Sequence, residues 1–467
     1  MLGFGILLLI MTVRLLLASP GKRHVARLGG LKWYRNQFCR GWLITGDTGS
    51  GKTSSGINQL AHQVFRNEPT WGGLCIDEKG AYWETLSAMA RHYGREHDLI
   101  HLQIRANDSD THWSPSHRFN LTSDRSIPFT TYAKFVVDTA TSLGQGGDKG
   151  FFKSQAQTHI AHALELLYEL NRPVTLRGAF ELLSNRELLK DEMENLEALL
   201  ETPRREAVHA HFANRFLTQP DEQLGGVRET IANYLQYFLT PEVAEVFCTG
   251  ESTFDYGAID QGKIILTTMP QKFQTERRYV NTFLKLLYYN HALRRFDKSK
   301  AERANDNLLI LWADEAQRFM TASEDGTSDY NCVDVIREAG ATVVAAAQST
   351  TSLVPPLGND KAKVLTLNLR NRMIFRAADE ADAVQAADFL GKKRVVKRSW
   401  GYSAGKQTTN YSETEEHKIK PHKLRNLRDH ECVLVHCERG FRRVTLPPLE
   451  SNGTVAPWFS CWRRFLP

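Results

Sequence analysis

Apolar residues of this chain fall into short continuous runs, and stretches with helical spacing separate these runs. The run at residues 41–45 leads into a glycine-rich loop, and residues 53–65 then have the spacing of a helix. A second run, residues 73–76, ends at two acidic residues and is followed by another helical pattern. A strand, a loop, a helix and a second strand in this order predict the start of a parallel α/β sheet.

From about residue 125 to residue 240 the pattern changes to long helical periodicities with few β-branched runs. Strand patterns then return at residues 263–268, 308–313, 341–346 and 372–375. We therefore predict an α/β fold whose sheet is built from two segments of the chain, with an all-α domain inserted between them. The polar stretch 396–430 is expected to be an exposed hairpin or loop, and residues 432–446 one or two final strands.

The beginning of the chain has a different pattern. Residues 1–18 are mostly apolar and carry no charge except that of Arg14, and basic residues follow as far as Arg40 without a single acid. This order predicts a short transmembrane anchor with the bulk of the chain in the cytoplasm. A cleaved signal and a helix lying in the membrane interface are the alternatives. The seven cysteines form no paired framework, which also favours the cytoplasm.

The formal net charge of +6 is unevenly distributed, because both ends of the chain are basic and the middle is acidic. Basic ends suit contact with an anionic membrane surface or with nucleic acid, and equally suit solvated termini. Tyr402 and Tyr411 lie among basic residues and could stack on bases, although an exposed loop explains them as well. The cysteines and histidines of residues 430–437 fit a strand better than a metal site.

A complete phosphate-binding motif occupies the loop between the first strand and the first helix. Its glycines allow backbone amides to wrap phosphates, Lys52 reaches the β- and γ-phosphates, and the Thr53 hydroxyl ligates Mg²⁺. The motif predicts a P-loop NTPase that binds ATP and Mg²⁺. Its predicted nucleotide-binding residues are Gly46, Asp47, Thr48, Gly49, Ser50, Gly51, Lys52 and Thr53.

Two acids follow the apolar run 308–313, and they complete the chemistry that a P-loop requires. Asp314 would hold Mg²⁺ through water, and Glu315 would polarise the attacking water as general base. Gln348 ends the next apolar run, where it could sense the γ-phosphate or orient water. Arg337 could be an arginine finger that reaches a neighbouring subunit, or it could pair with Glu338 or Asp334.

The order of these motifs resembles the TraG/TraD-type coupling ATPases of conjugation and type IV secretion. The resemblance covers most of residues 40–450. It is carried by the P-loop and by residues 77–80, 254–255, 314–319, 337–340, 347–349, 379–382 and 390–391.

The resemblance implies a RecA-like P-loop motor that is anchored in the bacterial inner membrane and acts as a homo-hexamer. Such a ring would receive single-stranded DNA bound to a relaxase and drive it into the channel of a type IV secretion system. By position in the motifs, Arg337 resembles the finger that acts in trans and Gln348 the γ-phosphate sensor. The inserted all-α domain would contribute to contact with DNA and substrate.

The domains expected from these patterns are a transmembrane anchor, a basic juxtamembrane linker, a nucleotide-binding domain in two segments, the inserted all-α domain and a C-terminal tail. In chain order they span residues 1–18 (anchor), 19–40 (linker), 41–124 (first nucleotide-binding segment), 125–240 (all-α insertion), 241–450 (second nucleotide-binding segment) and 451–467 (tail). Two other functions remain open: a double-stranded DNA pump of the FtsK or HerA type, and a nucleotide-gated substrate receptor without motor activity.

Overall fold

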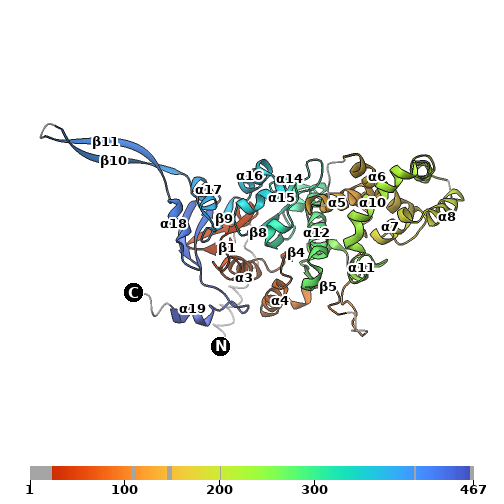
Figure 1. Ribbon diagram of the computed structural model, residues 1–467. Helices are drawn as coiled ribbons and strands as arrows, with labels where there is room; N and C mark the ends of the chain where they lie inside the picture. The colour runs from red at the N-terminus through yellow and green to blue at the C-terminus, as the bar shows by residue number, and fades with distance from the viewer. Residues whose placement is uncertain (1–23, 108–111, 145–149, 200, 404–405, 463–467) are drawn as a thin grey trace, which may run out of the picture. The chain divides into compact units, whose positions relative to one another are not determined.

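The computed structural model describes residues 24–107, 112–144, 150–199, 201–403 and 406–462 (Figure 1). The chain divides into two compact units. The first unit comprises residues 1–67, 344–355 and 366–467, and the second comprises residues 68–343 and 356–365.

The sheet of the first unit has the strand order β13-β12-β9-β3-β8. Its strands are β3 (Trp42–Thr45), β8 (Ala341–Ala347, which enters this unit at residue 344), β9 (Asn371–Ile374), β12 (Glu431–His436) and β13 (Gly440–Thr445). β3 is parallel to both β8 and β9, whereas β12 is antiparallel to β9 and β13. All four residues of β3 are buried, as expected for a central strand in a parallel arrangement.

Helices of the first unit follow the strands or end the chain. They are α2 (Arg35–Phe38), η2 (Lys52–Ile57), α3 (Asn58–Asn67), η10 (Thr351–Leu353), α17 (Glu380–Leu390), α18 (Pro421–Arg425) and α19 (Pro457–Trp462). A hydrophobic core joins α17, α18 and β12, with Leu390, Leu424 and Val433 among its buried members. α15 (Val354–Leu357) and α16 (Asn359–Asn368) run across the boundary between the units.

Residues 24–40 differ from the basic linker expected for residues 19–40. They form β1 (His24–Leu28), β2 (Leu31–Tyr34) and α2, and β1 pairs with β2 as an antiparallel hairpin. Trp33 is fully buried, and its indole nitrogen donates to Asn371 Oδ1 at 2.8 Å. The physical reason is a strand pattern of apolar residues on both sides of the Gly29-Gly30 turn, which the count of basic residues obscures.

The polar stretch near the end of the chain forms a long two-stranded hairpin of β10 (Lys392–Ser403) and β11 (Lys406–His417). Figure 1 shows this hairpin running away from α17 and α18 of the same unit, in blue. The expectation of an exposed hairpin or loop is correct here, and β12 and β13 are the two final strands.

The sheet of the second unit has the strand order β7-β4-β6-β5, and its strands are all parallel. They are β4 (Gly72–Asp77), β5 (Leu99–Gln103), β6 (Ile264–Thr268) and β7 (Leu309–Asp314). β4 and β6 are buried through nearly their whole length, which is why the sequence shows continuous apolar runs instead of alternation. β5 alternates between buried and partly exposed residues, and the sequence reasoning did not identify it.

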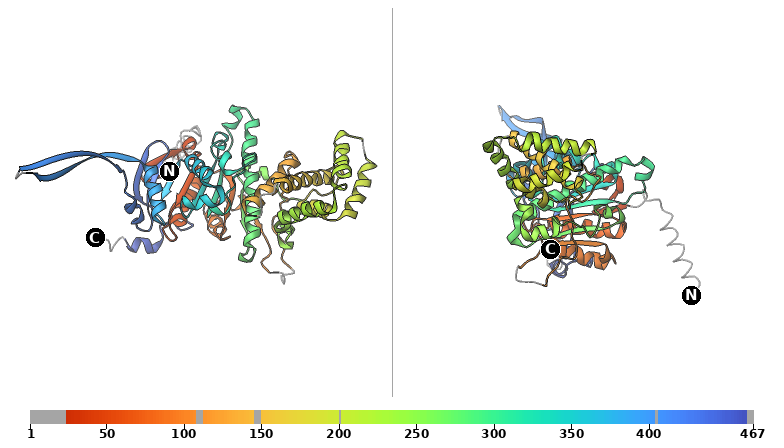
Figure 2. Two further views of the ribbon diagram at one scale, coloured as in Figure 1. Left: turned by 45° about the horizontal axis from the view of Figure 1, so that its top comes forward. Right: turned by 90° about the vertical axis from the view of Figure 1, so that its right-hand side faces the viewer.

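Helices make up the long stretch between β5 and β6, in which the described residues contain no strand. They are α5 (Phe129–Ser142), α6 (Gly150–Glu169), α7 (Leu176–Ser184), α8 (Arg186–Glu197), α9 (Pro203–His211), η4 (Phe212–Phe216), α10 (Asp221–Leu239) and α11 (Pro241–Phe247). α6 packs against α5, α7 and α10, as the neighbouring brown, yellow and green helices in Figure 2 show. Side chains of Thr175, Asn185 and Thr202 cap three of these helices.

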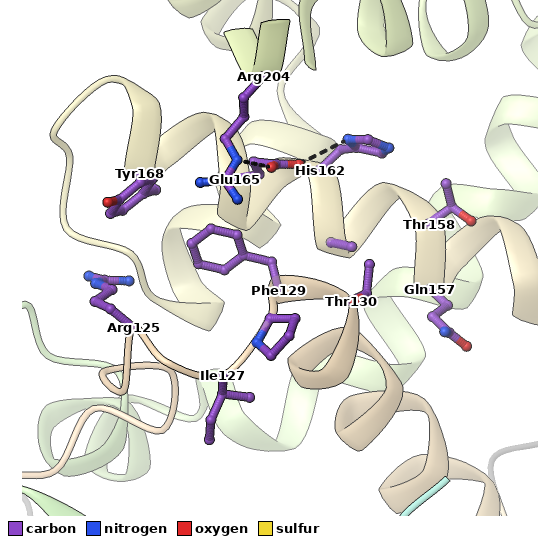
Figure 3. Close-up of a pocket in the computed structure, with 12 residues that line it drawn as sticks. Arg125, Ile127, Phe129, Thr130, Gln157, Thr158, His162, Glu165, Tyr168 and Arg204 are labelled. Atoms are coloured by element: carbon purple, nitrogen blue, oxygen red, sulfur yellow. Dashed lines mark ion pairs between the residues drawn. The ribbon is translucent and has the colours of Figure 1, made fainter. Parts of the chain in front are cut away.

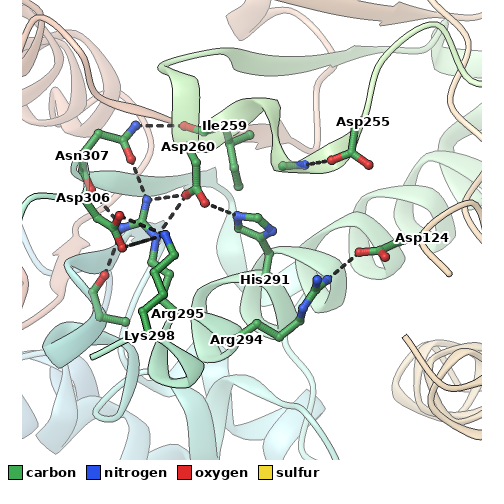
Figure 4. Close-up of polar contacts among 12 residues, drawn as sticks. Asp124, Asp255, Ile259, Asp260, His291, Arg294, Arg295, Lys298, Asp306 and Asn307 are labelled. Carbon is green, nitrogen blue, oxygen red and sulfur yellow. Dashed lines mark hydrogen bonds and ion pairs between the residues drawn. The ribbon is translucent and has the colours of Figure 1, made fainter. Parts of the chain in front are cut away.

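A polar network fixes the end of the long helix α12 (Gln274–Arg294) (Figure 4). His291 pairs with Asp260 at 3.1 Å, and Arg294 pairs with Asp124 at 2.5 Å. Burial alone would raise the pKa of Asp260, but a hydrogen bond from His291 and the charge of Arg295 hold this pKa well below its ordinary value. Asp260 precedes β6 and so lies at the amino ends of the parallel strands. Because ligands of open α/β sheets bind at the carboxyl ends of the strands, this network stabilises the fold and does not form a binding site.

Other helices of the second unit are α4 (Tyr82–His92), α13 (Lys300–Arg303), α14 (Asp329–Cys332) and short 3₁₀ turns that include η9 (Ile336–Ala339). No helix among the described residues has the length and apolarity needed to cross a membrane. The predicted anchor at residues 1–18 lies outside the residues that the structure describes.

Candidate nucleotide-binding site

The phosphate-binding motif lies in the first unit, directly after the buried strand β3. Gly46, Gly49 and Gly51 have positive φ angles of 155°, 80° and 102°. A Cβ at Gly46 would lie 2.6 Å from Phe375 Cβ, and a Cβ at Gly51 would lie 2.7 Å from His430 Nδ1. The loop therefore requires glycine for both its conformation and its close neighbours, as in a loop whose backbone amides wrap an anion.

Lys52 is buried at the centre of this loop. Its ammonium donates to the carbonyl oxygens of Gly46 at 2.6 Å and of Asp47 at 3.2 Å. Lys52 and Thr53 begin η2, which continues into α3, so the loop opens a helix as the motif requires. A positive charge, backbone amides and a hydroxyl at a helix start form a donor set that suits a triphosphate with its Mg²⁺.

Gln348 lies beside the loop in the same unit, immediately after β8. The amide of Gly46 donates to the backbone oxygen of Gln348 at 3.2 Å, and the side chain of Gln348 is exposed. The structure therefore brings Gln348 to the phosphate-binding loop, because β3 and β8 are parallel neighbours that end at the same edge.

Three residues around the loop were not identified from the sequence. Arg376 accepts a hydrogen bond from the Asp47 amide at 2.8 Å through its carbonyl oxygen, and its guanidinium lies 3.7 Å from the Asp47 carboxylate and 2.8 Å from that of Asp429. The amide of His430 donates to the Ser50 carbonyl at 2.9 Å. Arg376 follows β9, which is parallel to β3, so the rule that ligands bind at carboxyl ends of strands could have indicated it.

The side chain of His430 lies against the phosphate-binding loop and η2. Its Nδ1 lies 2.7 Å from Ser55 Oγ in η2, and its ring packs against Trp458 and Phe459 of α19. Burial lowers the pKa of His430, although the nearby Asp429 opposes the shift. A neutral imidazole in this place adds no charge beside the loop, and its backbone has a positive φ of 65°.

Asp314 and Glu315 lie in the second unit, where β7 ends. In the pairing of β4 with β7, Asp77 is opposite Asp314. Asp77 accepts hydrogen bonds from the amides of Ala81 at 3.0 Å and Tyr82 at 2.7 Å, so it satisfies two amides at the start of α4. The carboxylate of Asp77 therefore has a structural contact at this edge, at the start of α4.

Glu315 has a left-handed backbone with a φ of 52°, which is uncommon for a residue other than glycine. Its carboxylate accepts a hydrogen bond from Gln317 Nε2 at 2.7 Å, and its amide donates to Asp314 Oδ1 at 3.0 Å. A strained backbone held by hydrogen bonds is a common feature of functional positions.

Arg337 lies in η9 of the second unit. Its side chain is 40 % exposed, and its guanidinium is 4.0 Å from the carboxylate of Glu338. The predicted pairing with Glu338 is thus present, and it is a long contact between exposed groups that holds the arginine weakly. The structure groups Asp314, Glu315 and Arg337 in one unit and the phosphate-binding loop with Gln348 in the other.

A cavity of about 350 Å³ lies within the helical segment, between α5 and α6 (Figure 3). Glu165 in its wall pairs with Arg204 at 3.1 Å and with His162 at 3.5 Å, and Arg125 lies over the ring of Tyr168. The lining of this cavity contains no part of the phosphate-binding motif.

Metal-ligating side chains do not gather elsewhere in the described chain, where no group of three or more His, Cys, Asp or Glu residues could hold a metal ion. Cys432 and His436 are buried members of β12, as the strand interpretation predicts. His436 Nε2 lies 3.0 Å from the carbonyl of Lys32, which ties β12 to the N-terminal hairpin.

Comparison with protein families gives one match. The model described as the DNA-binding domain of type IV secretion-system coupling proteins, TrwB_AAD_bind, matches residues 25–447. None of the curated proteins is similar enough to this chain to match it in sequence.

Solved structures of the conjugative coupling protein TrwB are similar to this chain in fold. Its unbound form shares 16 % identity, with a TM-score of 0.67 over 93 % of this chain and 90 % of that one. A complex with a non-hydrolysable ATP analogue shares 17 %, with a TM-score of 0.66 over 91 % and 89 %. A complex with ADP and Mg²⁺ shares 16 %, with a TM-score of 0.64 over 92 % of each chain.

Proposed function

Because this chain belongs to the family of type IV secretion-system coupling proteins, we propose that it is an ATPase that moves DNA into a secretion channel. One observation carries the proposal most directly. A complete phosphate-binding loop, with three glycines at positive φ and a buried lysine, lies at the carboxyl end of a central parallel strand. This arrangement suits ATP and Mg²⁺, and a relative of the same fold has been solved with ADP and Mg²⁺.

Each residue of the predicted site has a proposed role. Lys52 and the loop amides would bind the β- and γ-phosphates, and Thr53 with Asp314 would hold Mg²⁺, which neutralises phosphate charge when it is bound. Glu315 would accept a proton from the attacking water. Its carboxylate is already oriented by Gln317, which supports this role.

Two residues would report the state of the nucleotide. Gln348 would sense the γ-phosphate, because its backbone carbonyl accepts a hydrogen bond from the amide of Gly46 at the start of the phosphate-binding loop. Arg337 would act in trans on the nucleotide of a neighbouring subunit, and its weak contact with Glu338 leaves it available for this. A site shared in this way requires an assembly, for which we propose a homo-hexameric ring.

Membership of the family supports a proposal for the cargo and the surroundings of the ring. The ring would receive single-stranded DNA with its relaxase from the relaxosome and pass it to components of the type IV secretion channel during conjugation. Residues 1–18 would anchor it in the bacterial inner membrane, with the ATPase in the cytoplasm. The helices of residues 125–240 would form the inserted domain that contacts DNA and substrate, between the nucleotide-binding segments 41–124 and 241–450.

The test is the rate of ATP hydrolysis with and without single-stranded DNA, measured together with the size of the protein in solution at low salt. We expect DNA to stimulate hydrolysis and the protein to assemble. A rate that is indifferent to DNA, from a protein that stays monomeric, would overturn the proposal.

Two outcomes would favour the other functions. Stronger stimulation by duplex than by single-stranded DNA would indicate a double-stranded DNA pump of the FtsK or HerA type. Normal transfer of substrate by a Glu315→Gln variant would indicate a nucleotide-gated receptor without motor activity.

A further inference from the structure

The hairpin of β10 and β11 has an exposed aromatic face. In the register of the two strands Arg398 is opposite Tyr411, and Trp400 is two residues from Arg398 on the same strand. Since side chains alternate between the faces of a strand, Arg398, Trp400 and Tyr411 share one face. Trp400 is 59 % exposed and Tyr411 is 68 % exposed.

Arg398 connects the two aromatic rings. Its guanidinium lies 4.2 Å from the ring centroid of Trp400 and 5.9 Å from that of Tyr411. Among the described residues, no ion pair joins Arg398 to a carboxylate. The three planar groups therefore form a row on the hairpin surface, which we call the aromatic row.

Charge separates the outer part of the hairpin from its root. At the root, Lys392 and His417 both pair with Asp388 of α17, at 3.7 Å and 2.9 Å. Glu416 pairs with Lys397 and Lys420. The outer part, which runs from Val396 and its partner Glu413 to the turn, contains three basic residues, Lys397, Arg398 and Lys406, and one acid, Glu413. Ion pairs therefore anchor the root to α17, and the outer part keeps a net positive charge.

We infer that the aromatic row is a binding site for single-stranded nucleic acid, with bases stacked on Trp400 and Tyr411 and with phosphates attracted by Arg398 and the neighbouring basic residues. Exposed rings interleaved with positive charge are the feature that proteins use to bind single strands without regard to sequence. Lysines on an exposed edge strand prevent it from pairing with strands of other molecules, which is another explanation for the basic residues of the hairpin. It does not explain the two solvent-exposed rings.

A single strand fits this surface better than a membrane does. Val396, which is 58 % exposed, is the only Val, Leu, Ile or Met among residues 396–411, so the face offers little aliphatic area to bury in lipid. The opposite face carries Ser399, Ser412 and Thr414, which are polar. The inference rests on the proposed function for the choice of DNA as the nucleic acid.

The test is the affinity of the full chain for fluorescently labelled oligo-dT of about 30 nucleotides, measured by anisotropy without nucleotide and at one fixed salt concentration. We expect the double variant Trp400→Ala with Tyr411→Ala to bind at least about 10-fold more weakly, because stacking contributes on the order of 10-fold or more for each base. The double variant Trp400→Phe with Tyr411→Phe keeps both rings and is expected to bind nearly as well as the parent.

A matched pair of charge variants separates the two faces. Arg398→Ala and Lys397→Ala each remove one positive charge from neighbouring positions, and only Arg398 lies in the aromatic row. We expect Arg398→Ala to weaken binding more than Lys397→Ala. Basal ATP hydrolysis and the circular dichroism spectrum should match those of the parent in every variant, because none of these residues is in the nucleotide site.

Three outcomes would overturn the inference. Parent-like binding of oligo-dT by the alanine double variant would exclude stacking on the row. Unchanged oligo-dT binding with lost binding to phosphatidylserine vesicles would make the hairpin a membrane contact, and unchanged binding with a changed size in solution would make it a contact between subunits.

If DNA stimulates hydrolysis by the parent while the variants behave as the parent does, only the inference fails. If the parent neither binds oligo-dT nor responds to it, the proposed function fails as well.

Discussion

The side chain of Lys52 shows how a single residue is prepared for its task. It is buried at 8 % exposure, and its ammonium is held by two carbonyl oxygens of the loop that it completes. Because a buried charge is costly unless hydrogen bonds compensate it, these contacts fix the lysine at the centre of the loop.

We expect Lys52→Ala to lower the affinity for a fluorescent ATP analogue by about 100-fold or more, since it removes the charge-assisted contacts to phosphate. Equilibrium binding measures the effect. Lys190→Ala removes an exposed lysine of α8 and is the control, which should bind as the parent does. Equal binding by the Lys52 variant would mean that the loop does not hold phosphates.

Glu315→Gln is expected to keep nucleotide binding and to lose turnover by roughly 10²- to 10⁴-fold, because the amide cannot accept the proton of the attacking water. Single-turnover hydrolysis measures the loss, and binding of the ATP analogue shows that the site is intact. Glu187→Gln removes an exposed carboxylate of α8 and is the matched control. Turnover that survives in the Glu315 variant would assign the base to another residue.

Among the elements, the helical segment contains an unusual group of three histidines. His159 Nδ1 lies 2.9 Å from His211 Nε2, and the ring of His162 stacks on that of His211 at 3.8 Å. Burial, with His162 nearby, lowers the pKa of His159 to about 4 and that of His211 to about 3. The packing of α6 against α9 therefore holds both imidazoles neutral.

This packing predicts a pH dependence of stability. In the unfolded chain both histidines titrate near their ordinary pKa of about 6.5, so between there and about pH 4 the unfolded state binds more protons than the folded state. The contribution of the two histidines to the free energy of unfolding is complete above pH 6.5. It is lost as pH falls, at about 1.4 kcal/mol per pH unit for each proton that the unfolded state binds in excess.

Thermal unfolding followed by circular dichroism between pH 7.5 and pH 4.5 measures this dependence. The double variant His159→Gln with His211→Gln removes both proton-binding sites and should show a flatter profile than the parent. Profiles of equal slope would contradict the assignment and would leave carboxylates as the source of acid sensitivity.

At the scale of the whole molecule, the proposed ring would divide each catalytic site between two copies of the chain. A subunit would supply the phosphate-binding loop with Lys52, and its neighbour would supply Arg337. The residues of one catalytic site would then belong to two different polypeptides.

Mixing two inactive variants tests this division. Lys52→Ala and Arg337→Ala should each hydrolyse little ATP alone, whereas a mixture assembled together should regain activity at sites that combine an intact loop with an intact arginine. Steady-state hydrolysis against mixing ratio measures the rescue. If the two variants assemble together and their mixtures still hydrolyse no more ATP than the separate variants do, Arg337 acts within its own subunit.

Much of the fold follows from local patterns. The apolar runs identify β3, β4, β6, β7, β8 and β9, because strands buried on both faces need apolar residues at every position. β5 is buried on one side only and so lacks a continuous apolar run, and basic residues interrupt the apolar positions of β1 and β2 in the N-terminal hairpin.

The sequence alone determined the chemistry: the phosphate-binding loop, its lysine and the two acids after a strand follow from residue types at fixed spacing, which local geometry enforces. Only the tertiary structure decided which residues surround that loop. Arg376 and His430 come from segments more than 300 positions away in the chain, and strand pairing brings them to Asp47 and Ser50. Contacts of this kind depend on the order of strands in a sheet, which no local pattern specifies.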